Sequence, residues 1–233
     1  MTEPIRSLAA RYYTDRQVFE VENAGLLAKT WQFGCHASEL TETGDYATFE
    51  IAGESLFAIR GRDDKIRVFY NVCQHRAHQL VSGTGTTRVV VCPYHAWTYE
   101  LTGELRAGPN IYAVEGFDKS GICLTEVRAE EFVGFVFVNL DPDAAPMEEW
   151  FPNARAELEE WVPNWVDLKP LEWVDIPENC NWKVSVENYS ECYHCSLNHP
   201  TFANGVVKPE TYDIQPQGKC LRHTTECQSL EDM

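Results

Sequence analysis

The sequence predicts an α+β protein with helical segments near both ends and a small all-β domain between them. Three observations lead to this expectation. Residues 14–31 combine a helix-start pattern with an apolar face, residues 44–140 show short strand-like runs separated by turn residues, and residues 183–197 hold no glycine or proline. We therefore expect three parts, which are residues 1–40, residues 41–141 and residues 142–233.

The first helix is expected to begin near Asp15. Thr14, Asp15 and Gln17 are typical of a helix start, and Val18 and Val21 begin an apolar face. In the middle part, alternating or apolar runs indicate strands at residues 55–60, 66–70, 89–92 and 132–139. Turn residues separate these runs, which favours a sheet of several short strands.

The composition is that of an ordinary globular chain with a strong acidic excess. The 233 residues are 44% hydrophobic, and 19 basic against 36 acidic residues give a formal net charge of -17. This charge argues against nucleic acid or an anionic membrane surface as a partner. No apolar run is long enough to span a membrane and the N-terminus has no secretory pattern, so the sequence predicts a cytoplasmic protein.

Four residues form the most informative motif of the chain. Cys73 and His75 form C-x-H, and after sixteen intervening residues Cys92 and His95 form C-x-x-H. Each short loop supplies one thiol and one imidazole, whereas zinc sites commonly pair cysteine with cysteine and histidine with histidine. The alternation suits a two-iron cluster, because each loop can give its cysteine to one iron and its histidine to the other. A structural zinc site is the alternative.

A second group of candidate ligands lies near the end of the chain. Asn181 can cap a helix in which Glu191 and His194, three residues apart, share one face. His194 and His199 are five residues apart, which separates them by roughly 140° on a continuous helix. If both bind one metal, the helix must end between them, and Pro200 favours such an end. Two histidines placed this way fill two positions of the two-histidine, one-carboxylate ligand set of non-haem Fe(II) oxygenases.

The other cysteines do not suggest a disulfide framework. The total of nine is odd and the spacing outside the motifs is irregular, so we expect mostly buried free thiols. Cys192 and Cys195 form a C-x-x-C around His194, for which a redox or zinc role is the alternative. No βαβ pattern surrounds them, so we interpret both as packing residues. For His194 and His199 taken alone, core or capping histidines are the corresponding alternative.

Together, the two motifs resemble the catalytic α subunits of Rieske non-haem iron oxygenases over essentially the whole chain. The resemblance implies a Rieske domain at residues 41–141 after the N-terminal helical segment. It also implies the helical start of a helix-grip-like catalytic domain from residue 142, with the carboxylate ligand of the iron lying beyond this chain. The implied cofactors are a Rieske [2Fe-2S] cluster on Cys73, His75, Cys92 and His95, and a mononuclear non-haem Fe(II) on His194 and His199.

In this family, an acidic residue at the position of Glu191 carries electrons between subunits. It links the iron-ligand histidine to a cluster histidine of the neighbouring subunit, which implies a ring-shaped homotrimer. The resemblance also implies a reductase or ferredoxin as electron donor, dioxygen, and a small-molecule substrate. Asn188 is a further candidate to support the iron ligands.

Details of the motifs resemble one branch of the family. Ala77 and Ala96 stand where glycine is frequent, and Glu191 replaces the commoner aspartate, as in oxygenases of quaternary ammonium compounds. Stachydrine (proline betaine) demethylase resembles the chain most, with glycine betaine, carnitine and choline monooxygenases as relatives. His78 and Tyr94 stand where respiratory Rieske proteins have a disulfide, which argues against that group. The branch implies oxidative N-demethylation, and the alternatives are an aromatic-ring hydroxylating dioxygenase α subunit and a non-enzymatic Rieske electron carrier.

Overall fold

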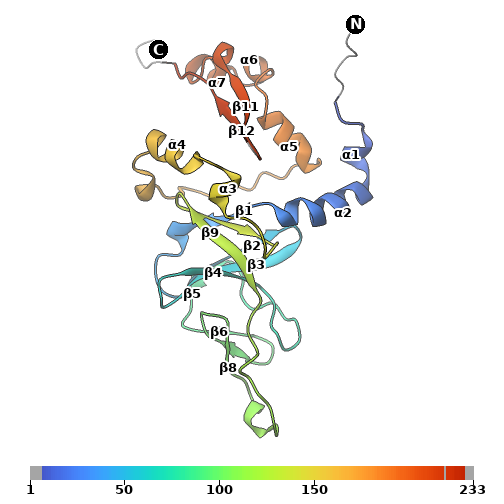
Figure 1. Cartoon of the computed structure of the whole chain (residues 1–233), viewed down its shortest axis with the longest axis vertical. Helices are drawn as coiled ribbons and strands as arrows, with labels where there is room; N and C mark the ends of the chain where they lie inside the picture. Colours follow the sequence, from blue (N-terminus) through green and yellow to red (C-terminus); the bar gives the residue numbers. More distant parts are fainter. Residues whose placement is uncertain (1–6, 218, 229–233) are drawn as a thin grey trace. The chain divides into compact units, whose positions relative to one another are not determined.

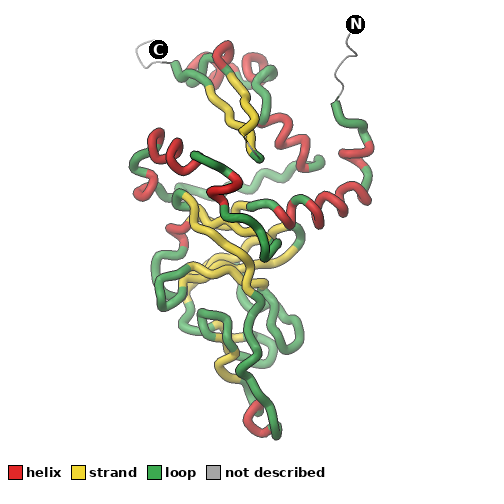
Figure 2. Tube along the Cα trace, viewed as in Figure 1, coloured by secondary structure: helices red, strands yellow, loops and turns green. Residues whose placement is uncertain are grey.

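The computed structural model describes residues 7–217 and 219–228 and divides the chain into two compact units. The sheet unit consists of Val21–Met147 and Arg155–Trp173, and the C-terminal unit consists of the described residues of Met1–Glu20, Glu148–Ala154 and Val174–Met233. Helices and strands both occur, which confirms the predicted α+β class (Figures 1 and 2). Among the described helices, none has the length and apolar character needed to cross a membrane.

Two antiparallel sheets form the sheet unit. The larger has seven strands in the order β1-β10-β9-β4-β3-β2-β5, and the smaller has three in the order β6-β7-β8. The strands of the larger sheet are β1 (Gln32–His36), β2 (Asp45–Ile51), β3 (Glu54–Arg60), β4 (Ile66–Tyr70), β5 (Thr84–Thr86), β9 (Glu126–Phe132) and β10 (Phe135–Asn139). Those of the smaller sheet are β6 (Val90–Val91), β7 (Thr98–Tyr99) and β8 (Leu105–Ala107).

Two tight hairpins set the register of the larger sheet. Ala52 and Gly53, with φ of 53° and 84°, join β2 to β3, and Val133 and Gly134, with φ of 50° and 82°, join β9 to β10. Positive φ at both central residues is typical of a type I′ turn, whose twist matches that of the strands it joins. The single strand predicted over residues 132–139 is therefore wrong, because the apolar run continues through the turn and conceals the reversal.

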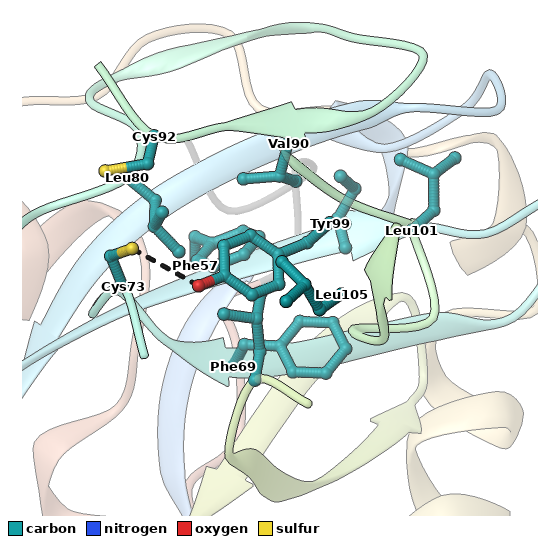
Figure 3. Packing of buried hydrophobic residues seen from close by; sticks show 11 residues of the cluster. Phe57, Phe69, Cys73, Leu80, Val90, Cys92, Tyr99, Leu101 and Leu105 are labelled. Atoms are coloured by element: carbon teal, nitrogen blue, oxygen red, sulfur yellow. Dashed lines mark hydrogen bonds between the residues drawn. The ribbon is translucent and has the colours of Figure 1, made fainter. Parts of the chain in front are cut away.

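The core between the two sheets brings side chains from both together. Phe57 on β3 and Phe69 on β4 share one cluster with Val90 on β6 and Tyr99 on β7, and none of the four is more than 1% exposed. Figure 3 shows the Tyr99 ring in the middle of this cluster. Burial of these side chains fixes the small sheet against the large one, because apolar area removed from water stabilises the contact.

Short helices and one hairpin make up the other described elements. The helices are α1 (Arg11–Thr14), α2 (Arg16–Gly25), α3 (Met147–Trp150), α4 (Ala154–Trp161), α5 (Trp182–Tyr189), α6 (Cys195–Asn198) and α7 (Pro200–Gly205). Single 3-10 turns occur at Leu27–Lys29, Ala37–Glu39, Ile111–Ala113, Trp165–Asp167 and Pro209–Thr211. The hairpin pairs β11 (Asp213–Gln217) with β12 (Cys220–Thr224). Asp15 accepts the backbone N–H of Gln17 at 2.8 Å, which confirms the predicted helix start at α2.

The helix predicted after Asn181 is shorter than expected. Asn181 Oδ1 accepts the backbone N–H of Lys183 at 3.1 Å, so the predicted cap is confirmed, but α5 ends at Tyr189. The side chain of Glu191 then accepts the backbone N–H of Tyr193. This bond satisfies a donor that a continuing helix would otherwise use. The expectation of one uninterrupted helix is therefore wrong beyond Tyr189.

Candidate metal centres

Two loops with the same hydrogen-bond pattern carry the four predicted cluster ligands. The Cys73 N–H donates to the carbonyl five residues ahead, and the Cys73 carbonyl accepts the N–H of Ala77, both at 2.9 Å. In the second loop, the Cys92 N–H donates to the carbonyl of Trp97 at 2.8 Å, and the Cys92 carbonyl accepts the N–H of Ala96 at 2.9 Å. Because these bonds are local, each loop is defined by its own short sequence. The two loops therefore present their side chains in a similar way.

The residue that closes each loop has a left-handed backbone conformation. Its φ is 54° at Ala77 and 56° at Ala96. A side chain in this region brings Cβ close to the following carbonyl, at a cost of roughly 1–2 kcal/mol that glycine avoids. The two alanines singled out in the motif thus occupy positions where the backbone favours glycine.

The two thiols are buried, and the two imidazoles lie nearer the surface. Cys73 and Cys92 are each 2% exposed, His75 is exposed and His95 is half-buried. The two imidazole rings are 4.8 Å apart, so the loops bring both histidines to one place. The indole of Trp97 stacks on His75 at 4.7 Å with the ring planes 10° apart. Two thiols and two imidazoles from two loops are the donor set of a mixed-ligand two-iron cluster.

The candidate metal ligands among the described residues do not form groups of three or more around one point. Within residues 7–217 and 219–228, no three side chains of His, Cys, Asp or Glu are grouped as ligands of a single metal ion.

Tyr99 supports the first loop from inside the core. Its hydroxyl accepts the backbone N–H of Gln74 at 3.0 Å and lies 3.2 Å from the sulfur of Cys73, as the dashed line in Figure 3 marks. Burial, followed by the contact with Cys73, raises the pKa of Tyr99 above its ordinary value. The phenol therefore remains protonated and can donate to the Cys73 sulfur. Burial, with a contribution from His75, lowers the pKa of His95 and favours the neutral imidazole that binds metals.

His194 and His199 line one cavity of about 560 Å³ in the C-terminal unit. Their rings are 5.2 Å apart and inclined by 76°. The predicted break between them is confirmed, because α6 ends at Asn198 and Pro200 is the first residue of α7. Asn188 also lines this cavity, so it faces the same space as the two histidines.

Glu191 lies against His194 within this cavity. Its Oε1 is 2.5 Å from Nδ1 of His194, and this hydrogen bond lowers the pKa of the Glu191 carboxyl. A carboxylate that accepts the Nδ1 proton leaves Nε2 of the imidazole as the nitrogen able to bind a metal. The predicted pairing of Glu191 with the iron-ligand histidine thus has a direct local contact, although the two residues do not share a continuous helix.

Cys192 and Cys195 form a disulfide, and both line the cavity with His194 and His199. The interpretation of the pair as packing thiols is therefore wrong, and the C-x-x-C spacing was the signal for the bond. The expectation of mostly buried free thiols also fails. Of the seven free cysteines, Cys35, Cys73 and Cys92 are buried, and the other four lie on loops or on β12 with partial or full exposure.

No sequence motif indicated a role for three aromatic residues that line the same cavity, namely Tyr189, Tyr212 and His223. They come from the end of α5, the residue before β11, and β12. Because Tyr212 and His223 reach Tyr189 from more than twenty residues away along the chain, no local spacing could indicate that the three residues meet. The only sequence feature that pointed to these residues was their aromatic character.

Comparison with known families identifies both parts of the chain. Residues 30–118 match the Rieske [2Fe-2S] domain, and residues 165–231 match the catalytic domain of the ring-hydroxylating α subunit. The chain therefore belongs to the α subunits of Rieske-type oxygenases, and the family inferred from the motifs is confirmed. The Rieske domain of this family binds a [2Fe-2S] cluster, and its catalytic domain binds a non-haem iron.

Among individual relatives, the carnitine monooxygenase oxygenase subunit of Escherichia coli K12 is 45% identical over 201 residues, which are 86% of this chain and 54% of that protein. The α subunit of 2-aminobenzenesulfonate 2,3-dioxygenase from Alcaligenes sp. is 35% identical, over 87% of this chain and 52% of that protein. The quaternary ammonium Rieske monooxygenase CntA, solved with L-carnitine, superposes with a TM-score of 0.86 at 40% identity, over 92% of this chain and 61% of that chain. The chain spans about half the length of the curated relatives it matches.

Proposed function

We propose that this chain is part of an oxygenase component that hydroxylates an N-methyl group of a quaternary ammonium compound. Hydroxylation at that carbon gives an unstable product that loses formaldehyde, so the net reaction is N-demethylation. One observation carries the choice of substrate class. The described residues that line the cavity of His194 and His199 include the carboxylate Glu191 and several aromatic rings, but no lysine or arginine. Such a lining suits a cation better than an aromatic acid.

Four residues of the sheet unit are proposed to hold the [2Fe-2S] cluster, namely Cys73, His75, Cys92 and His95. The bound cluster supplies single electrons. Burial of the two thiols keeps water from the sulfur side, while the exposed His75 provides a route by which electrons can leave. Tyr99 supports the Cys73 side through its hydroxyl.

His194 and His199 are proposed as two ligands of the mononuclear iron, and Fe(II) in such a site supplies the activation of dioxygen. Glu191 orients the His194 imidazole by accepting its Nδ1 proton. It is the one carboxylate among the described residues that line the cavity, and it is already bonded to His194. The third ligand, a carboxylate elsewhere in the oxygenase, remains a prediction from the family.

We also propose that the oxygenase is a homotrimer fed by a reductase or a ferredoxin, with Glu191 as the electron bridge between subunits. The contact between Glu191 and His194 supports one half of that bridge. A solved quaternary ammonium Rieske monooxygenase, 41% identical over 89% of this chain, is described in terms of inter-subunit electron transfer. The other half of the bridge requires a hydrogen bond that Glu191 accepts from a cluster histidine of a neighbouring subunit.

Product analysis of the oxygenase that contains this chain tests the function. With an electron donor, dioxygen and either L-carnitine or glycine betaine, formaldehyde should form in proportion to the dioxygen consumed. The dioxygenase relative provides the second candidate function, so 2-aminobenzenesulfonate is the matched aromatic substrate. Diol formation from it, without formaldehyde from either betaine, would replace N-demethylation with ring hydroxylation. A Rieske electron carrier would give neither product, and the match of residues 165–231 to a catalytic domain argues against that alternative.

A further inference from the structure

A disulfide lies directly beside the proposed iron ligands, and the iron ligand set does not include it. Cys192 and Cys195 form this bond, and His194 stands between them in the sequence. Both cysteines line the cavity that His194 and His199 also line. The bond therefore closes a covalent ring over residues 192–195, and one residue of that ring is a proposed ligand.

The backbone connects this ring to the second histidine. The Cys195 N–H donates to the Cys192 carbonyl at 3.1 Å, so the chain turns back on itself inside the ring. The Cys195 carbonyl accepts the N–H of His199 at 2.9 Å, which extends the same hydrogen-bonded segment to that residue. A bond between the two sulfurs thus restricts the backbone that carries both proposed ligands.

The two halves of the disulfide differ in accessibility. Cys195 is buried, at 6% exposed, whereas Cys192 is half-buried. The C-x-x-C spacing is the one found in redox-active cysteine pairs. Thiol–disulfide exchange begins when a thiolate attacks a sulfur that it can reach. Cys192 is therefore the half that a reductant attacks, and Cys195 is the half that leaves.

We propose that Cys192 and Cys195 are a reversible thiol–disulfide pair, and that the disulfide state holds Fe(II) on His194 and His199 more firmly than the dithiol state. The proposal rests on the iron ligands of the proposed function and adds a redox dependence of their metal binding. A cross-linked segment has less conformational freedom to lose when its side chains bind a metal, so an ordered site binds more tightly. Reduction returns that freedom to the backbone around His194.

Reduction of the pair requires a dithiol. One thiol of the reductant loses its proton and attacks the Cys192 sulfur, the bond between the two protein sulfurs breaks, and Cys195 leaves and takes up that proton. The second thiol of the reductant then loses its proton and displaces Cys192, which takes up this proton in turn. The reductant becomes a disulfide and the pair becomes two thiols.

Oxidation of the pair requires a peroxide that accepts two electrons. The Cys192 thiol loses its proton and attacks one oxygen of hydrogen peroxide, which gives a sulfenic acid and one water. The Cys195 thiol then attacks the Cys192 sulfur. A second water leaves with the proton of Cys195, and the disulfide forms again.

Alkylation shows whether the pair cycles in the folded protein. The oxygenase that contains this chain is kept as purified in air, or is incubated with dithiothreitol and then freed of it under argon. Each sample is then denatured in iodoacetamide, and the peptide with Cys192 and Cys195 is weighed by mass spectrometry. Both cysteines should resist alkylation before reduction, react after it, and resist again after treatment with hydrogen peroxide. Thiols that react before reduction, or a disulfide that dithiothreitol does not open, overturn the proposal.

Iron release measures the effect of the pair on metal binding. The iron-loaded oxygenase, in its disulfide or dithiol form and freed of reagent under argon, is mixed with a chelator that forms a coloured Fe(II) complex. The visible absorption of the cluster is followed at the same time to show that the cluster remains intact. The dithiol form should release the mononuclear iron about tenfold faster, in line with the smaller effects of changing the support of a metal ligand. Equal release rates overturn the proposal.

Substitutions assign the effect to this pair. Cys192→Ser cannot form the bond and should release iron at the fast rate with or without dithiothreitol. Cys227→Ser is the matched control, because Cys227 is an exposed free cysteine of the C-terminal unit that does not line the cavity. This control should keep the slow release and its acceleration by dithiothreitol. If Cys192→Ser fails to fold by circular dichroism, Cys195→Ala removes the same bond. A dithiothreitol effect that persists in a folded variant without the bond contradicts the assignment.

The two proposals fail in different ways. If iron release depends on the state of the pair but the oxygenase forms no formaldehyde, the demethylase function is wrong and the redox pair stands. If formaldehyde forms while both states release iron at the same rate, the function stands and the redox dependence is wrong.

Discussion

The phenolic oxygen of Tyr99 lies 3.2 Å from the sulfur of Cys73 within the core between the two sheets. Tyr99 is fully buried, and its only hydroxyl proton is directed to that sulfur because the oxygen already accepts the N–H of Gln74. A hydrogen bond to a cluster sulfur stabilises the more negative, reduced state more than the oxidised state. If Cys73 binds the cluster as proposed, the Tyr99 hydroxyl therefore raises the reduction potential of the cluster.

The first prediction is that Tyr99→Phe lowers the reduction potential of the cluster. Loss of one hydrogen bond to a charged group corresponds to about 1–3 kcal/mol, which is on the order of 40–130 mV for one electron. Redox titration followed by EPR measures the shift. Tyr46→Phe is the control, because Tyr46 packs against the same cluster of side chains and has no bond to Cys73. An unchanged potential in Tyr99→Phe would show that the hydroxyl does not act on the cluster.

The second prediction concerns the strained alanine that closes the Cys92 loop. Ala96→Gly removes a Cβ at φ of 56° and should stabilise the folded protein by up to about 1 kcal/mol, after the greater chain entropy of glycine is counted. Denaturant unfolding measures the change. Ala58→Gly, at a buried position within β3, should instead destabilise the protein. A loss of stability in Ala96→Gly would mean that the loop does not hold the left-handed conformation.

The third prediction concerns the proposed electron bridge. Glu191→Gln keeps an oxygen that can accept from His194 but removes the charge, and it should reduce turnover by at least about tenfold while leaving the cluster spectrum intact. Single-turnover measurements with a pre-reduced cluster should show slow electron transfer. Glu210→Gln, outside the cavity, is the control. Full turnover with both metals loaded would exclude the bridging role.

The fourth prediction uses the buried thiol of Cys35. Burial, with a smaller contribution from Glu39, raises the pKa of Cys35 to about 12. A raised pKa means that the folded state keeps the proton more firmly, so this contribution to stability is present below the unfolded-state pKa of about 8.5 and is lost as pH rises toward 12. In the folded protein at pH 8, iodoacetamide should modify exposed Cys227 far faster than Cys35. Equal rates by mass spectrometry would contradict the burial.

Local patterns predicted the parts of the fold that local interactions determine. The loops of Cys73 and Cys92 close through hydrogen bonds to residues four or five positions ahead, so the motif spacing already contained their geometry. The cap of Asn181 and the break before Pro200 are equally local. These features were therefore accessible from the sequence.

Features that depend on side-chain competition or on distant partners were not accessible. Periodicity could not show that Glu191 would take the N–H of Tyr193 and help to end α5. The apolar run through Val133 likewise concealed a hairpin, because turn and strand residues there have the same hydrophobic character. His223 meets Tyr189 only after the β11–β12 hairpin forms, and no spacing in the sequence records that contact.

Pulsed EPR of the reduced protein labelled with ¹⁵N-histidine determines whether Cys73, His75, Cys92 and His95 are the ligands of the cluster. Two strongly coupled histidine nitrogens are predicted, one from His75 and one from His95, and each should vanish when its residue is changed to cysteine. A reduced cluster without histidine coupling, or a colourless protein loaded with zinc, would contradict the assignment.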